Sequence, residues 1–144
     1  MKTLNLDDLD RVGIHSLKSS RAVTRLLRAC EVSSLHYRVV DIADVRNKAQ
    51  LLERLAETLR FPDYFGHNWD ALHDVLCDKT WFGDDGVVLH LKHTASFEIA
   101  IDDWLTLREI LEEAIAYWRS SGLPFWVFID LKPLPALPST TAAI

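Results

Sequence analysis

Three aspartates, Asp70, Asp74 and Asp78, recur at every fourth residue within the segment FPDYFGHNWDALHDVLCD, residues 61–78. Four residues are close to one turn of an α-helix, so this spacing predicts three carboxylates on one helical face. Like charges at that spacing destabilise a helix by roughly 0.2–0.5 kcal/mol per pair. A row of carboxylates can bind basic groups of a partner, ligate a metal ion or transfer protons. The pattern therefore indicates a function other than folding.

The simplest alternative is the solvated face of an amphipathic helix. Such faces usually mix acidic residues with Lys, whereas this one carries aspartate alone, a residue of mediocre helix propensity. Aromatic residues also lie beside it, namely Tyr64, Phe65 and Trp69. Helical periodicity predicts that Trp69 points to the core, while Tyr64 is either a core residue or a contact residue.

A metal site formed by His67, Asp70, His73 and Asp74 is a second alternative, because these residue types suit zinc. His73, however, lies about 100° around the helix from Asp74, and no HExxH spacing is present. Catalysis has less support, since the chain has no GxSxG elbow and no glycine-rich phosphate loop. The carboxylates are also expected on a convex helix, whereas acid–base chemistry needs a cleft. We therefore expect neither catalytic residues, nor a metal, nor a cofactor.

The charge of the chain is concentrated around the aspartates. The 144 residues have a net charge of −5, and residues 61–86 contain six of the 21 acids and one of the 16 bases. The remaining 15 acids and 15 bases cancel. A net negative charge argues against direct binding of nucleic acid, whose phosphates attract Lys and Arg. A basic protein is the partner that this charge favours.

The composition predicts one soluble domain in the cytoplasm. Of the residues, 49% are hydrophobic and 26% are charged, as is ordinary for a globular protein. The first twelve residues have no apolar run of the kind that a signal peptide needs, and no stretch of about 18 uncharged apolar residues suggests a membrane span. Cys30 and Cys77 are expected to remain reduced.

Hydrophobic periodicity predicts alternating helices and strands, with no assignment for residues 1–18. Strands separated by helices imply parallel pairing in an α/β layer structure. Asp102 or Asp103 is the predicted cap of the longest helix, and Pro62 ends an earlier one. The predicted strands are 36–42, 86–91 and 125–131, and the predicted helices begin after Ser19 or Ser20, span 47–60, begin at Asn68 and span 102–121.

The run from Pro62 to Asp74, PDYFGHNWDALHD, closely resembles the signature of the barstar family, Pro-acid-Tyr-aromatic-Gly-x-Asn-x-Asp-Ala-Leu-x-Asp. The resemblance implies a barstar-like α/β fold, with a small three-stranded parallel sheet layered with helices and an N-terminal helical extension. It places the barstar-like domain at residues 36–131. Residues 1–35 are then an extension packed on the core, and residues 132–144 a mobile tail that contains prolines.

Members of the barstar family are small intracellular inhibitors of a secreted basic ribonuclease, so the resemblance implies an inhibitor and not an enzyme. Such a protein is a monomer that forms a 1:1 complex and binds neither nucleic acid directly nor a membrane. Asp74 corresponds to the central acid that mimics an RNA phosphate. The residues expected to face the nuclease are Tyr64, Gly66, Asn68, Asp70, His73 and Asp74.

Two features of the binding segment depart from the family pattern. His73 replaces an aromatic contact, and the glutamate that family members present from the long helix corresponds to Tyr117 by ungapped counting, with Glu112 and Glu113 one turn earlier. A non-inhibitory interaction module, in which the same fold docks another basic protein, is the alternative function.

Overall fold

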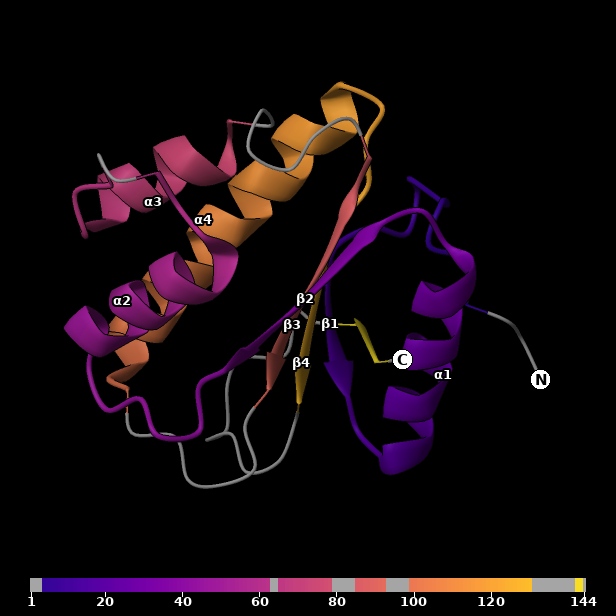
Figure 1. Cartoon of the computed structure of the whole chain (residues 1–144), viewed down its shortest axis with the longest axis horizontal. Coiled ribbons are helices and arrows are strands. Elements are labelled where there is room, and N and C mark those ends of the chain that lie inside the picture. The colour runs from indigo at the N-terminus through magenta and orange to yellow at the C-terminus, as the bar shows by residue number, and fades with distance from the viewer. Residues whose placement is uncertain (1–3, 63–64, 79–84, 93–98, 131–141, 144) are drawn as a thin grey trace.

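The computed structural model describes residues 4–62, 65–78, 85–92, 99–130 and 142–143. Helices and strands alternate along the chain, as the sequence predicts (Figure 1). The strands are β1 (Ile14–Leu17), β2 (His36–Asp41), β3 (Val87–Lys92), β4 (Phe125–Asp130) and β5 (Ala142–Ala143), and the helices are α1 (Ser20–Val32), α2 (Lys48–Leu59), α3 (Trp69–Leu76) and α4 (Ile101–Ser120).

The strands form one parallel sheet in the order β2-β3-β4-β1-β5. The α/β class and the three predicted strands, which are β2, β3 and β4, are confirmed, but the strand count was wrong. β1 adds a fourth strand by pairing Ile14 with Val127, and the two residues of β5 pair with β1. β1 has four residues and carries His15 and Ser16 at its centre, so it offers no apolar run that periodicity could detect.

Helices cover both faces of the sheet (Figure 1). α1 lies on one face, and α2, α3 and α4 lie together on the other. β3 and β4 are buried along almost their whole length, as expected for central strands of a parallel sheet with two covered faces. β2 forms an edge and is only partly buried. The acidic helix α3 and helix α1 therefore belong to opposite layers.

Local side-chain signals account for most helix boundaries. Ser19 caps α1, and its side chain accepts a hydrogen bond from the Ala22 amide. α2 ends at Leu59, where Arg60 adopts a left-handed conformation with φ of 56°, two residues before Pro62. Gly122, with φ of 79°, follows the end of α4.

The predicted cap of α4 was wrong. Ala100 occupies the N-cap position and makes no side-chain cap hydrogen bond, while Asp102 and Asp103 lie in the first turn. Their carboxylates still interact favourably with the positive end of the helix dipole from that turn. An aspartate near a helix start thus has two ways to stabilise it, and sequence alone does not distinguish them.

Two tryptophans connect segments that are distant in the sequence through buried hydrogen bonds. Trp118 of α4 is fully buried, and its Nε1 donates to the Leu76 carbonyl at the end of α3 at 2.8 Å. Trp126 of β4 is also buried, and its Nε1 donates to the Leu6 carbonyl at 2.7 Å. α3 is therefore attached to α4 by a directional contact as well as by apolar packing.

The segment predicted as a mobile tail, residues 132–144, lies mainly outside the described residues, but Ala142 and Ala143 form β5. The division of the chain at residues 35 and 131 stays a prediction. Within the described part of the chain, none of the helices is both long and apolar enough to cross a membrane.

Candidate protein-binding face

A tight turn starts α3 at the residue that the sequence predicts. The Asn68 Oδ1 accepts a hydrogen bond from the Ala71 amide at 2.8 Å, which is the expected N-cap contact. Its Nδ2 donates to the Gly66 carbonyl at 3.3 Å. His67 adopts a left-handed conformation with φ of 54°, and its Nδ1 lies 3.2 Å from the Phe65 carbonyl oxygen. The Asn68 side chain therefore holds the turn before the acidic residues begin.

The amphipathic pattern predicted for α3 is confirmed. Leu72, Val75 and Leu76 are buried. Trp69 is half-buried against the core, and the Lys48 Nζ lies 5.5 Å from the centroid of its ring. On the other side, Asp70 and Asp74 are exposed and Asp78 is half-buried. The Asp74 side chain is 86% exposed, so a partner can reach its carboxylate without unfolding the helix.

Helix α4 adds one glutamate to this side of α3. The Glu113 Oε2 lies 3.0 Å from the His73 Nε2, and the Asp74 Oδ1 lies 3.9 Å from the His73 Nδ1. Glu112 points elsewhere, because its Oε1 lies 3.3 Å from the Arg108 Nε. Of the two glutamates left open by the sequence, the structure therefore brings Glu113 to α3. We call Asp70, Asp74 and Asp78 of α3 together with Glu113 of α4 the acidic face.

Cys77 lies beside His73 in this region. Its Sγ lies 3.9 Å from the His73 Nε2. Burial raises the pKa of the Cys77 thiol, and the negative charges of Glu113 and Asp74 raise it further. Since the thiolate is the nucleophilic form of cysteine, a raised pKa keeps Cys77 unreactive at neutral pH.

A hollow of about 430 Å³ borders the acidic face. The expectation that the carboxylates stand on a convex helix was therefore wrong, because the turn before α3 and the exposed side of α3 together line this hollow. A concave, acidic surface can receive a protruding basic side chain. The lining residues are Phe65, Gly66, Asn68, Asp70, Ala71, Asp74, Val75 and Asp78.

The structure does not assemble the four residues considered as metal ligands. His67 packs its ring against Phe65, with the centroids 4.8 Å apart, whereas His73 faces Glu113 on another element. Within the described ranges, no group of three or more His, Cys, Asp or Glu side chains is arranged to hold a metal ion.

Five of the six predicted contact residues belong to this one region, while Tyr64 lies outside the described residues. Gly66, Asn68, Asp70 and Asp74 line the hollow, and His73 lies between the helices beside Glu113. Sequence reasoning did not single out a hydrogen-bonded chain of Tyr37, His90 and Asp130, which lies on the face of the sheet that α1 covers. The residues of that chain are distant in sequence and match no motif.

Comparison with protein families identifies the fold. The family model described as "Barstar (barnase inhibitor)" matches residues 35–130, from the start of β2 to the end of β4. This chain belongs to the barstar family. The match covers the acidic helix and both of its neighbouring helices, whereas β1 and α1 precede it.

Other comparisons give only distant similarity. No curated protein matches the chain. Among solved structures, Cdc6p from Pyrobaculum aerophilum superimposes with a TM-score of 0.56 and 14% identity over 81% of this chain and 32% of that chain. The Aeropyrum pernix ORC2 protein gives a TM-score of 0.46 and 15% identity over 83% of this chain and 42% of that chain. The chain spans about a third of the length of Cdc6p, and at this identity the similarity concerns the fold alone.

Proposed function

We propose that this protein is an intracellular inhibitor of a basic ribonuclease and that it acts by placing the acidic face over the nuclease active site. The observation that carries the proposal is the exposed acidic face beside a hollow, in a chain whose family is described as barnase inhibitors. That description also favours a binding role over an enzymatic one.

The charge of the acidic face suits the active site of a ribonuclease. Such a site must be basic because it binds the phosphates of RNA. Carboxylates placed there form charge-assisted hydrogen bonds with Arg and Lys, which are stronger than neutral ones. Asp74 is the most suitable phosphate mimic, since its side chain is 86% exposed and its Oδ1 lies 3.9 Å from the His73 Nδ1, beyond hydrogen-bond distance.

Opposite charges also accelerate association, and the barnase–barstar pair, whose inhibitor gives this family its name, is an established example of such steering. Steering of this kind weakens as salt screens the charges. We therefore expect both the association rate and the affinity to fall as the ionic strength rises.

Calorimetric titration of the protein into a small basic ribonuclease of the barnase type tests the proposal. We expect 1:1 binding that weakens with salt and inhibits RNA cleavage. Asp74→Ala should reduce the affinity by at least about a thousandfold, since it removes one partner of a buried charge pair.

Asp102→Ala is the matched control, because it removes the same charge from an exposed position at the start of α4. It should change the affinity by less than about threefold. A loss below tenfold for Asp74→Ala would remove Asp74 from the centre of the interface. Tight binding that leaves RNA cleavage intact would instead establish the non-inhibitory interaction module.

A further inference from the structure

A partly buried hydrogen-bonded chain crosses three strands on the side of the sheet that α1 covers. The Tyr37 Oη lies 2.9 Å from the His90 Nδ1, and the His90 Nε2 lies 2.9 Å from the Asp130 Oδ1. His90 is only 3% exposed. The Asp130 carboxylate accepts a hydrogen bond from the His90 Nε2–H, and in this neutral tautomer the Nδ1 accepts from the Tyr37 hydroxyl. The three side chains therefore hydrogen-bond to one another, and this holds the Tyr37 side chain in place.

Tyr37, His90 and Asp130 form part of the wall of a hollow of about 770 Å³ between α1 and the sheet. Its volume is in the range of small-molecule sites, which are usually 300–1,000 Å³. The lining residues are Leu17, Lys18, Ser19, Ser20, Val23, Thr24, Leu27, Tyr37, Val39, His90, Lys92 and Asp130.

One end of the hollow is cationic. β1, β3 and β4 are parallel, so their last residues Leu17, Lys92 and Asp130 lie at the same edge of the sheet, which is where open α/β sheets bind ligands. Lys18 follows β1 directly and precedes the first turn of α1. Neither lysine forms an ion pair with a carboxylate of a described residue. The Asp130 carboxylate at this end accepts a hydrogen bond from His90, and one carboxylate beside two lysines leaves a net charge of +1.

The other end of the hollow is apolar. Val39 is paired in register with His90, so its side chain lies on the same face of the sheet. It is 36% exposed, and Leu27 on the facing side of α1 is 41% exposed. Val23, one turn before Leu27, is partly buried and also lines this part. Apolar surface of α1 and β2 therefore stays uncovered in this part of the hollow.

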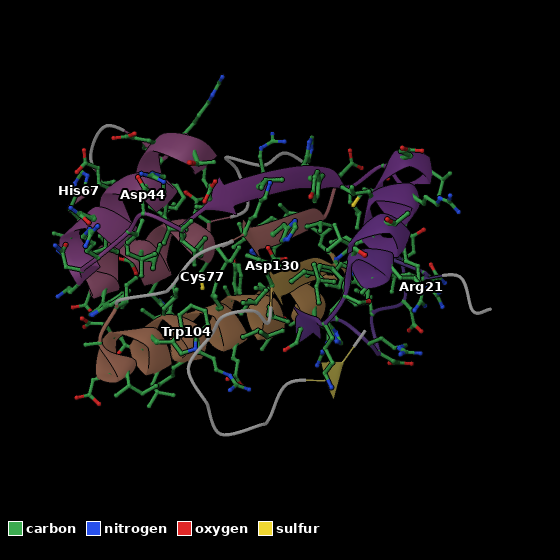
Figure 2. All side chains as sticks on the ribbon, turned by 90° about the horizontal axis from the view of Figure 1, so that it is seen from below. Arg21, Asp44, His67, Cys77, Trp104 and Asp130 are labelled. Carbon is green, nitrogen blue, oxygen red and sulfur yellow. The ribbon has the colours of Figure 1, made fainter. Side chains whose placement is uncertain are left out.

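We propose that this hollow binds a small amphipathic anion, with its charged head against Lys18 and Lys92 and its apolar body against Leu27 and Val39. The change from cationic to apolar lining along one hollow matches a ligand with a single carboxylate-type head and a hydrocarbon or aromatic body. The site is independent of the acidic face, because α1 and α3 lie on opposite sides of the sheet (Figure 1). Figure 2 likewise shows Arg21 of α1 and His67 at opposite ends of the molecule.

A pair of fluorescent probes tests the charge requirement. 8-Anilinonaphthalene-1-sulfonate carries an apolar body and one negative charge, and N-phenyl-1-naphthylamine has the same body without the charge. We expect saturable binding of one sulfonate probe per protein and at least about tenfold weaker binding of the neutral probe. Dodecanoate should displace the bound probe, and dodecylammonium should not. Equal affinity for both probes, or more than one bound sulfonate, would overturn the proposal.

Substitutions locate the binding site. The double variant Lys18→Gln/Lys92→Gln should weaken the sulfonate probe about tenfold and leave the neutral probe unchanged, whereas Arg28→Gln, on an exposed part of α1, should affect neither. Leu27→Glu should abolish binding of both probes. Val32→Glu is its matched control on the same helix, because Val32 is 85% exposed and does not line the hollow.

Circular dichroism of each variant excludes unfolding as the cause of a loss. If Leu27→Glu leaves probe binding intact in a folded protein, the probe binds elsewhere and the proposal fails. Asp74→Ala should leave both probes unaffected, so failure of this proposal and failure of the inhibitor proposal are separate results.

Discussion

Replacement of Trp118 by phenylalanine should test how α3 is held in position. Trp118 is fully buried, and its Nε1 donates at 2.8 Å to the carbonyl of Leu76, the last residue of α3. Carbonyls in the last turn of a helix have no partner within the helix, so this indole supplies one that the helix cannot. The substitution keeps an aromatic ring at this position and removes the donor.

The expected loss of stability follows from two terms. A buried carbonyl left without its partner costs about 1–3 kcal/mol. The smaller ring leaves apolar volume unfilled, which costs about 1 kcal/mol more. Together Trp118→Phe should lower the free energy of unfolding by about 2–4 kcal/mol, against roughly 7–20 kcal/mol for a domain of this size.

Trp126→Phe is the matched control. Trp126 is equally buried, and its Nε1 also donates to a backbone carbonyl, that of Leu6 at 2.7 Å, so urea unfolding should show a similar loss. Hydrogen exchange should separate the two variants, because only Trp118→Phe should accelerate exchange within α3 beyond the global effect. A loss below about 1 kcal/mol for Trp118→Phe, or equal exchange in α3 for both variants, would refute the reasoning.

Three further predictions concern the stability of the free protein. Asp74→Asn should leave it as stable or more stable by up to about 1 kcal/mol in urea unfolding, because it relieves repulsion along α3; clear destabilisation would assign the aspartates a structural role. Gly86→Ala should cost about 2–4 kcal/mol, since a Cβ at Gly86 would clash with the Pro124 carbonyl oxygen; an unchanged urea midpoint would contradict that close approach. Burial, with the negative charges of Cys30 and Asp130, raises the pKa of Tyr37 from 10.0 to about 12. The unfolded chain then loses this proton first, so the free energy of unfolding should fall between about pH 10 and pH 12, and Tyr37→Phe should reduce that fall in urea titrations at each pH.

Much of the candidate site could be predicted from sequence because its determinants are local. Asn68 caps α3 through a contact with a residue three positions later, and the spacing of Asp70 and Asp74 places both on one helical face. The family signature lies in the same unbroken run. Contacts within a turn or a helix depend on neighbouring residues alone, so the pattern of residue types determines them.

The remaining features depend on how distant elements pack. β1 is a strand because β4 pairs with it, although its own four residues carry a weak signal. Glu113, and not Glu112, joins the acidic face because one residue rotates a side chain by about 100° around α4, and only the packing of α3 on α4 decides which of the two faces His73.

The hydrogen-bonded chain of Tyr37, His90 and Asp130, which lines the hollow between α1 and the sheet, is the clearest case of a feature that the tertiary structure alone decides. Tyr37 and His90 are 53 residues apart, and His90 and Asp130 are 40 residues apart. Each residue looks ordinary within its own strand. They meet because parallel pairing sets the register of β2, β3 and β4, and register is a property of the assembled sheet.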